Sequence, residues 1–323
     1  MPDWITHLGT AYLGARATRL SPAGPLGGMV RPFVLGALLP DLTRFSVLLI
    51  DFLDWPAVPT FAYLIPFHSL LIVSLLAGAI SLLFTKTGHR PWRVFGLIEA
   101  GAAFHFLLDD LEGQIGCGST TFYPFYFGKP LNLWSTEGTF ARLLLVAGAV
   151  GIGAALVSRS GWPPPPLRLR LRRDKKVYIY SALLVAAALV IPLFTRGWLV
   201  AQDAYHLGFF ADPPAWEGAT VELCFSEIVT ADPLTVEEFD TRLPLALDAL
   251  NSTGRELSVG DWVSLRGVYR AGAIHPTLVV HHQKSSDVLL SALALAAFVI
   301  LWLPPIVLRW PPIHRRLRRS PRR

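Results

Sequence analysis

Hydrophobic residues gather in six long runs along the chain, and polar stretches separate these runs. The runs cover about residues 33–50, 62–84, 94–111, 140–157, 177–200 and 288–308. A helix needs roughly 20 apolar residues to cross the hydrocarbon core of a bilayer. The pattern therefore predicts a mainly α-helical, polytopic membrane bundle of six spans, preceded by a short N-terminal helix over residues 3–15.

One segment follows a different pattern. Residues 209–287 form a long polar stretch in which apolar and polar positions alternate, as in half-buried strands. Strands are predicted at 220–229, 262–269 and 277–282, and a short helix is allowed within 234–251. The run VGDWVSLRGVYRAGAIHPTLVVHHQK resembles the later strands of a small OB-like barrel. We therefore expect a small extracytoplasmic β domain with an OB-like fold in this segment.

These patterns divide the chain into six parts. They are a membrane helical domain carrying a metal site (1–160), a Pro/Arg-rich cytoplasmic linker (161–176), a transmembrane helix (177–208), the extracytoplasmic β domain (209–287), a second transmembrane helix (288–308) and a basic cytoplasmic tail (309–323). The linker contains four consecutive prolines, which favour an extended polyproline II conformation.

Composition and charge agree with a membrane protein and suggest its orientation. Hydrophobic residues make up 52% of the chain and charged residues 16%, whereas soluble domains carry roughly a quarter charged residues. Lysine and arginine cluster in the connections that lie on one side of the predicted spans, and such clusters favour the cytoplasm. We therefore expect a multi-pass protein of the plasma or inner membrane, with its C-terminus in the cytoplasm.

Charge also restricts the partners of the chain. The net charge of +6 comes mostly from the cytoplasmic connections, and the tail at 309–323 is expected to contact anionic lipid of the bilayer. Residues 212–287 instead carry 12 acidic and 5 basic residues, a net charge of −7. Nucleic-acid affinity depends largely on basic contacts to phosphate. No nucleic acid is therefore expected at the outer domain.

Ionisable residues interrupt the apolar runs, and in a membrane such residues usually mark a site or a pathway. The stretch FHFLLDD places His105 and Asp109 four residues apart, on one face of a helix. A histidine and a carboxylate at this spacing form half of a metal site, although a buried His–Asp pair has the same spacing. Asp110 points away from His105 and could cap the helix or accept a proton.

Two other runs carry similar residues at a similar depth. The first run should travel outward, the second inward and the third outward again. At the helical rise, Asp41 then lies roughly 13 Å from the outer end of its run, and His68 and His105 lie roughly 9 Å from theirs. Potential metal ligands from three helices are therefore expected together in the outer half of the membrane.

The motifs DWITHL, GALLPDL, PFHS and HFLLD…YPF occur in this order within residues 1–140. In this respect the chain resembles the predicted membrane-bound metal-dependent hydrolases of the YdjM-like, LexA-regulated inner-membrane group. The resemblance implies five metal ligands, which are His7, Asp41, His68, His105 and Asp109. Many members have a further acid where this chain has Thr43 and a further histidine where it has Tyr63. These differences favour one metal ion rather than two.

The sequence therefore predicts a metal-dependent hydrolase that acts on an ester or phosphoester, either lipid-linked or in the envelope space. The expected ion is divalent, with zinc favoured, and it would lower the pKa of its water toward ~7. Asp110 is the expected proton acceptor and Ser69 the expected hydrogen-bond donor. One alternative is a non-catalytic protein with a structural His/Asp site, whose outer β domain binds an envelope partner. Another is an ion-coupled carrier, since histidine and aspartate also serve in relays.

Three further features bear on the outer side. The connection at 112–137 is rich in glycine and aromatic residues, and it is either an interfacial lid over the site or part of an aromatic belt. Cys117 and Cys224 are both expected outside, where a disulfide is permitted, although isolated cysteines are by default free thiols. His281 and His282 are adjacent strand residues that point to opposite faces, so we expect ordinary surface histidines there.

Overall fold

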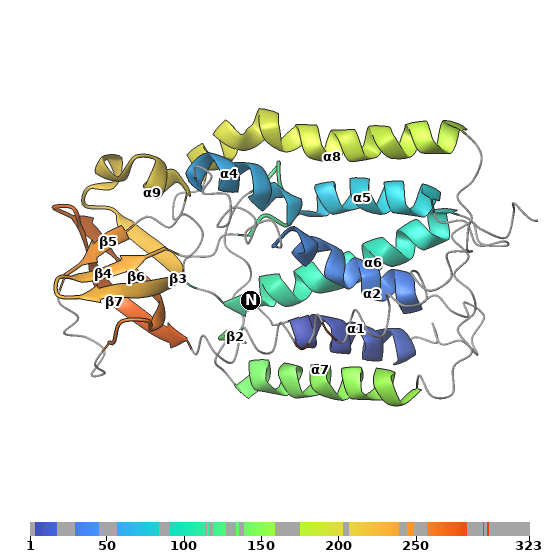
Figure 1. Cartoon of the computed structure of the whole chain (residues 1–323), viewed down its shortest axis with the longest axis horizontal. Coiled ribbons are helices and arrows are strands. Elements are labelled where there is room, and N and C mark those ends of the chain that lie inside the picture. The colour runs from blue at the N-terminus through green and yellow to red at the C-terminus, as the bar shows by residue number, and fades with distance from the viewer. Residues whose placement is uncertain are drawn as a thin grey trace, which may run out of the picture.

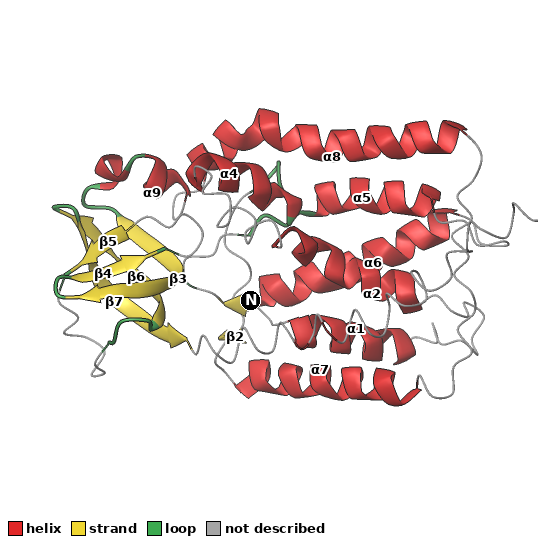
Figure 2. Cartoon of the chain, viewed as in Figure 1, coloured by secondary structure: helices red, strands yellow, loops and turns green. Residues whose placement is uncertain are grey.

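The computed structural model consists of a helical bundle with a small β barrel at one end (Figures 1 and 2). It describes residues 4–17, 30–44, 57–83, 91–113, 115, 119–126, 134–135, 139–158, 175–202, 207–238, 244–248, 257–282, 293 and 296. The predicted cytoplasmic tail, nearly all of the linker, and the run at 288–308 apart from Leu293 and Ala296 lie outside these residues.

The prediction of a six-span bundle is wrong. The described residues form eight α-helices, and two of these are long and apolar enough to cross a membrane. These two are α7 (Thr139–Ser158) and α8 (Lys175–Gln202). A third span is reached if α4 (Ala57–Leu64), the 3-10 turn η2 (Ile65–Phe67) and α5 (Leu70–Leu83) count as one span bent by 60°.

Two of the other runs fall short for local reasons. The first forms α2 (Val30–Leu38), which continues as the 3-10 turn η1 (Leu39–Arg44), because Pro40 lacks the amide hydrogen that an α-helix needs. The third run forms α6 (Pro91–Leu111), which is 21 residues long but carries several ionisable side chains. Neither helix meets the length and composition of a membrane span.

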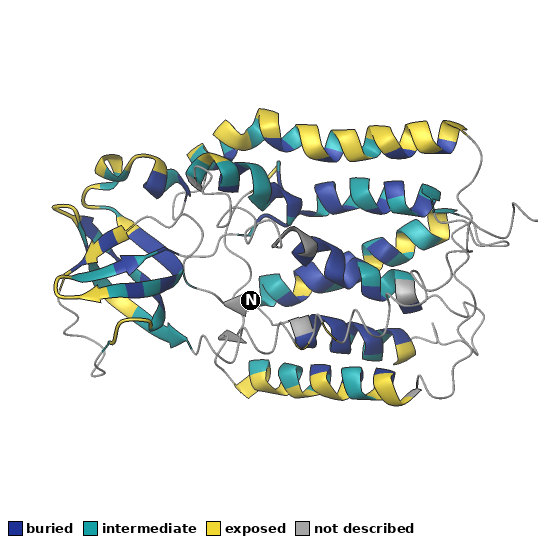
Figure 3. Ribbon diagram, in the orientation of Figure 1, coloured by how far each residue is buried: buried dark blue, intermediate teal, exposed yellow. Residues whose placement is uncertain are grey.

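Glycines allow the helices of the bundle to pack backbone against backbone. Helix α1 (Trp4–Ala17) packs against α7 and α2, and α2 packs against α6. A Cβ atom on Gly9 would lie 1.8 Å from the carbonyl oxygen of Gly148, and one on Gly101 would lie 2.0 Å from that of Phe33. Most side chains of α1 are buried, so this helix is part of the bundle rather than lying on its surface (Figure 3).

The barrel contains five strands closed in the order β3-β4-β5-β7-β6. They are β3 (Thr220–Ala231), β4 (Leu234–Glu237), β5 (Pro244–Leu247), β6 (Trp262–Arg270) and β7 (Ala273–His282). The β5–β7 pair is parallel and the other pairs are antiparallel. Five-stranded Greek-key barrels of this kind include the OB fold. The expected strands at 220–229, 262–269 and 277–282 lie within β3, β6 and β7.

The described residues of the segment 234–251, where the sequence allowed a short helix, are not helical. The described part of this segment instead supplies β4 and β5. Leu245 and Leu247 point into the barrel, while Pro244 and Ala246 are exposed. A period of two places leucines on one face of a strand, and β5 bridges β4 and β7 in the closed sheet. The requirement for barrel closure outweighs the local helix propensity of this leucine- and alanine-rich stretch.

Two apolar clusters, both contacted by Val58, join the barrel to one end of the bundle. The short helix α9 (Leu207–Ala211) places Phe209 and Phe210 in the barrel core. Leu207 packs in a second cluster with Phe61 of α4 and Tyr123. A 3-10 turn, η4 (Pro213–Trp216), leads from α9 toward β3, and two short strands, β1 (Glu112–Gly113) and β2 (Trp134–Ser135), pair in parallel beyond α6. The barrel is thus fixed at the end of the bundle where α6 finishes (Figure 1).

The barrel contains a disulfide-bonded cysteine, whereas free thiols are the default expectation for the two cysteines. Cys224 of β3 is disulfide-bonded. Cys117 is the only other cysteine of the chain and lies outside the described residues. We therefore expect a Cys117–Cys224 crosslink, visible as one crosslinked peptide in a non-reducing digest of protein exported to an oxidising compartment. Labelling of Cys224 by a thiol reagent in denatured, unreduced protein would contradict this prediction.

Candidate metal centre

Five ionisable side chains meet at the end of the bundle that faces the barrel. They come from the first turn of α1, from η1, from the break between η2 and α5, and from the last turns of α6. These residues are His7, Asp41, His68, His105 and Asp109. His7, Asp41 and His105 are at most 3% exposed. The side chains of His68 and Asp109 are 17% and 12% exposed. The structure thus gathers all five of the implied ligands.

Four of these residues bring possible ligand atoms close to the two histidine nitrogens Nε2 of His68 and His105. His68 Nε2 lies 3.1 Å from His105 Nε2 and 3.2 Å from Asp109 Oδ2. His105 Nε2 lies 3.1 Å from the same Asp109 oxygen. Asp41 Oδ1 lies 3.5 Å from His68 Nε2 and 3.7 Å from His105 Nε2.

These distances fit the ligands of one metal ion. Metal–ligand bonds of about 2.0–2.1 Å in a tetrahedron separate neighbouring ligand atoms by roughly 3.3 Å. The five distances given above, among atoms of Asp41, His68, His105 and Asp109, range from 3.1 to 3.7 Å. The buried histidine and aspartate groups could therefore hold a metal ion.

A backbone carbonyl fixes the orientation of His105. Its Nδ1 atom lies 2.8 Å from the carbonyl oxygen of Ala37 on α2. A carbonyl oxygen only accepts hydrogen bonds, so Nδ1 carries the proton and Nε2 keeps its lone pair. Metal-binding histidines usually hold their second nitrogen in this way. The Ala37 contact thus directs the free Nε2 toward the two aspartates.

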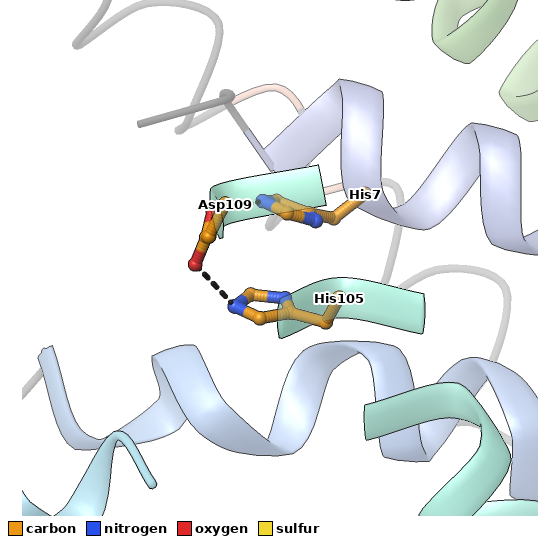
Figure 4. Close-up of side chains that lie close together, drawn as sticks. All are labelled: His7, His105 and Asp109. Carbon is orange, nitrogen blue, oxygen red and sulfur yellow. Dashed lines mark ion pairs between the residues drawn. The ribbon is translucent and has the colours of Figure 1, made fainter. Parts of the chain in front are cut away.

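His7 extends the cluster on the side of α1. Its ring stacks on that of His105, with centroids 3.9 Å apart, and its Nε2 lies 3.3 Å from Asp109 Oδ1 (Figure 4). Both nitrogens of His7 and both carboxylate oxygens of Asp109 are buried without a hydrogen-bond partner among the described residues. His7 Nε2 and both oxygens of Asp109 have a neighbour at ion-pair distance but lack hydrogen-bond geometry, and His7 Nδ1 has neither within the described part of the chain. Buried polar atoms normally have a partner, and a shared cation satisfies such atoms.

Two overlapping groups of three residues have metal-ligand spacing. One group is His7, His105 and Asp109, and the other is Asp41, His68 and His105. His105 belongs to both groups, but its Nδ1 is held by Ala37 and only its Nε2 remains. One nitrogen binds one ion, so the two groups are alternative ligand sets within a single site. Tyr63 stands where many members of the resembled group have a histidine. Its hydroxyl donates a hydrogen bond to the carbonyl of Leu189 on α8.

Ser69 holds the break before α5 together. Its hydroxyl donates to the carbonyl of Pro66 over 2.5 Å and lies 3.4 Å from the amide nitrogen of Ile72, as an N-terminal cap does. The side chain is fully buried. Its single proton is used within the chain, so the expected role as a hydrogen-bond donor to substrate does not fit this geometry.

Asp110 fastens a neighbouring segment that in turn holds His68. Its Oδ1 atom accepts hydrogen bonds from the hydroxyls of Ser119, over 2.7 Å, and Thr121, over 3.1 Å. The hydroxyl of Thr120 donates to the carbonyl of His68, and the carbonyl of Thr121 accepts from the amide of Leu70 over 3.0 Å. No sequence motif indicated these threonines or the Ala37 carbonyl. The contacts of Asp110 are those of a positioning residue.

The two roles of Asp110 predict different results for two substitutions. Asp110→Ala removes the acceptor for Ser119 and Thr121, so metal affinity should fall about 10–100-fold, as for other outer partners of metal ligands. Asp110→Asn keeps a carbonyl oxygen there and should retain nearly wild-type affinity and activity. Competition with a chromophoric chelator measures the affinity. An Asn variant that keeps the ion but is inactive would restore the proton-accepting role.

The barrel histidines lie apart from this cluster. His281 Nε2 is 3.3 Å from Asp261 Oδ2, whereas His282 Nε2 is 2.9 Å from the hydroxyl of Ser264. Burial is the largest cause that lowers the pKa of His282, to about 4. The two histidines therefore face different partners.

His282 should make the stability of the barrel depend on pH. Its pKa is about 6.5 in the unfolded chain and about 4 in the folded barrel. The unfolded state therefore binds more protons between these values, and the free energy of unfolding should fall as pH falls from 6.5 toward 4. Thermal unfolding at pH 7 and pH 5 checks this. The free energy of unfolding should fall less between these pH values in His282→Asn than in the wild type. An equal loss in both proteins would contradict it.

No family model, no curated protein and no solved structure matches the chain. The resemblance to membrane-bound metal-dependent hydrolases, and the ligand roles it implies, therefore stay a prediction.

Proposed function

We propose that the protein is an integral-membrane, metal-dependent hydrolase that cleaves an ester or phosphoester with one divalent ion, zinc being the favoured metal. The chemistry of the donor set carries this proposal. Each of the two candidate groups contains only histidine and aspartate. Catalytic zinc sites use three ligands of this kind and keep a fourth position for water, whereas structural zinc sites are usually rich in cysteine.

The exposure of the ligands supports access for a substrate. His68 and Asp109 are the two partly exposed members, and the other three are buried. Substrate would therefore approach from the side of His68 and Asp109. When bound there, a divalent ion supplies an acidified water and polarises the scissile carbonyl or phosphoryl group. The chain would orient His105 through Ala37 and hold His68 in place through Thr120.

The proposal places the cluster near the outer surface of the membrane. The linker before α8 is rich in arginine, and α8 itself begins with Lys175 and Lys176. The barrel follows the other end of α8 and contains the disulfide-bonded Cys224. Basic residues favour the cytoplasm, and disulfides form in oxidising compartments. Both features support an extracytoplasmic barrel, and the proposal adds a cytoplasmic C-terminus and a lipid-linked or envelope substrate.

Metal analysis combined with hydrolysis assays tests the proposal. Protein purified in detergent after growth in metal-replete medium should contain about one divalent ion per chain. Chelation should abolish hydrolysis of chromogenic esters or phosphoesters, and added zinc, manganese or cobalt should identify the working metal. Protein without metal above background, or metal-loaded protein inactive on both substrate classes, would contradict the proposal.

A structural metal site is the second candidate, and one observation favours it. His68 Nε2 and His105 Nε2 each lie 3.1–3.7 Å from an oxygen of Asp41 and an oxygen of Asp109, so an ion that took all four side chains as ligands would have no open position. The absorption spectrum of the cobalt-substituted protein separates the two cases. Added azide should shift the spectrum of a site with an open position and leave a closed site unchanged.

A further inference from the structure

Three exposed aromatic side chains directly follow the segment of chain that holds His68. The turn at residues 121–125 is closed by hydrogen bonds from the amides of Phe125 (2.9 Å) and Tyr126 (3.2 Å) to the carbonyl of Phe122. These bonds have helical spacing, so Phe122, Phe125 and Tyr126 share one side of the turn. Their exposed fractions are 57%, 86% and 56%. We call these three side chains the aromatic face.

The exposure of the aromatic face is built into the fold. Tyr123, between its members, is 1% exposed and packs with Phe61 and Leu207. The residues just before it are hydrogen-bonded to His68, Leu70 and Asp110, as described above. An anchored turn therefore presents three large apolar side chains outward. Each such ring buries about 150–250 Å² when it finds a partner.

The aromatic face lies close to the more open ligands. Thr120 precedes it by two residues and donates a hydrogen bond to the carbonyl of His68. His68, at 17%, is the most exposed of the five cluster side chains. A molecule that reaches the cluster past His68 would therefore pass the aromatic face.

The level of the aromatic face matches the edge of a membrane. The ring of Tyr123 lies 6.1 Å from that of Trp198, and Leu199 belongs to the same apolar cluster. Both residues are close to the end of the candidate span Lys175–Ala201. The outer sides of α7 and α8 are exposed and apolar along their lengths (Figure 3). If α8 spans the bilayer, the turn stands at headgroup level, where aromatic side chains are enriched.

We propose that Phe122, Phe125 and Tyr126 bind the acyl part of a bilayer lipid and hold its ester or phosphoester group at the opening beside His68 and Asp109. The substrate class is thus an amphiphilic lipid rather than a water-soluble ester. This inference rests on the proposed hydrolase function. The arrangement fits an amphiphilic molecule. Its acyl chain would lie against the aromatic face, and its polar group would lie at the ionisable side chains of the cluster.

Lipid contact is measured first, because it does not depend on activity. A bimane fluorophore is attached to Phe125→Cys in full-length protein reconstituted in phosphatidylcholine nanodiscs that contain lipid with a nitroxide on its acyl chain. Cys224 is disulfide-bonded and does not compete for the label. The matched control is Val259→Cys on the barrel, which is 61% exposed. Quenching at position 125 should be several-fold stronger than at 259, and equal quenching overturns the inference.

Substrate choice is measured second, with glycerophospholipids that share a headgroup and differ in acyl length. Phe122, Phe125 and Tyr126 are changed to serine together. This variant should lower kcat/KM at least about 10-fold for the dioleoyl substrate and less than 2-fold for the dibutyroyl substrate. The reason is that only the long acyl chain loses much apolar contact with the aromatic face. Metal content should not change. Trp92→Ser, a 61% exposed tryptophan at the far end of α6, is the control and should alter neither rate.

The outcomes separate the inference from the function on which it rests. An equal effect of the triple serine variant on both substrates means that the aromatic face does not select lipid, and it overturns the inference while the hydrolase proposal stands. Wild-type protein that cleaves neither substrate class contradicts the hydrolase proposal. In that case the quenching result alone decides whether the aromatic face contacts lipid.

Discussion

His105→Ala should remove the metal ion from the purified protein and abolish hydrolysis. His105 contributes to both candidate ligand groups, and its Nε2 lies within 3.1 Å of ligand atoms on His68 and Asp109. Loss of an outer partner of a ligand costs about 10–100-fold in metal affinity, so loss of the shared ligand itself should cost more than 100-fold. Elemental analysis and chelator competition measure this effect.

A histidine outside the cluster gives a matched control. His275 of β7 also pairs with an aspartate, because its Nδ1 lies 2.9 Å from Asp248 Oδ2, but this pair is exposed. His275→Ala should therefore keep the full metal content and activity. Equal metal loss in both variants would indicate unfolding rather than loss of a ligand. Full metal retention in His105→Ala would remove this residue from the site.

The sequence predicted the meeting of the ligands better than it predicted the membrane spans. The depth argument needed only the direction of consecutive helices to alternate. Asp41 follows α2, His68 precedes α5 and His105 lies near the end of α6, so alternating directions bring all three to one end. This result does not require each helix to cross a bilayer, which is why it survives the failure of the six-span prediction.

The span count failed because hydrophobic content does not determine where a helix breaks. The first run contains Pro40, and the α-helix ends at Leu38. The second run contains the PFHS motif, and the helices on either side of it meet at 60°. Both breaks place ligands, since Asp41 lies in η1 and His68 between η2 and α5. Polar residues inside an apolar run marked the site and also shortened the helices.

Contacts that depend on tertiary structure gave no sequence signal. The carbonyl of Ala37 orients His105, but any residue has a carbonyl, so only the packing of α2 on α6 reveals it. Ser119 and Thr121 resemble an ordinary polar loop until Asp110 is seen to accept their hydrogen bonds. In the barrel, alternation predicted the long strands, whereas the short strand β5 became evident only through its pairing with β4 and β7.

Gly101→Ala should weaken metal binding although Gly101 is not a ligand. A Cβ atom at this position would lie 2.0 Å from the carbonyl oxygen of Phe33 and 2.8 Å from the amide nitrogen of Ala37. These are backbone atoms of α2, so the helix must move away from α6. Gly101 and His105 are four residues apart on the same face of α6, and the moved helix carries the Ala37 carbonyl that orients His105.

We expect two measurable effects of this methyl group. Overpacking typically costs about 1–3 kcal/mol, and contact with backbone should place this variant at the upper end. Disturbing the partner of a metal-binding histidine should lower metal affinity about 10–100-fold. Thermal unfolding in detergent and chelator competition measure these effects. Gly36→Ala should act similarly, because its Cβ would lie 1.9 Å from the carbonyl oxygen of Ile98 across the same interface.

Gly96→Ala on the same helix is the control that separates packing from helix propensity. A Cβ atom at Gly96 meets nothing within 4 Å, so the substitution should be neutral or stabilise the helix by up to about 1 kcal/mol. If Gly101→Ala and Gly96→Ala both bind metal as the wild type does, the α2–α6 contact does not set the orientation of His105. If only Gly101→Ala loses affinity, the backbone contact between these two helices is part of the metal centre.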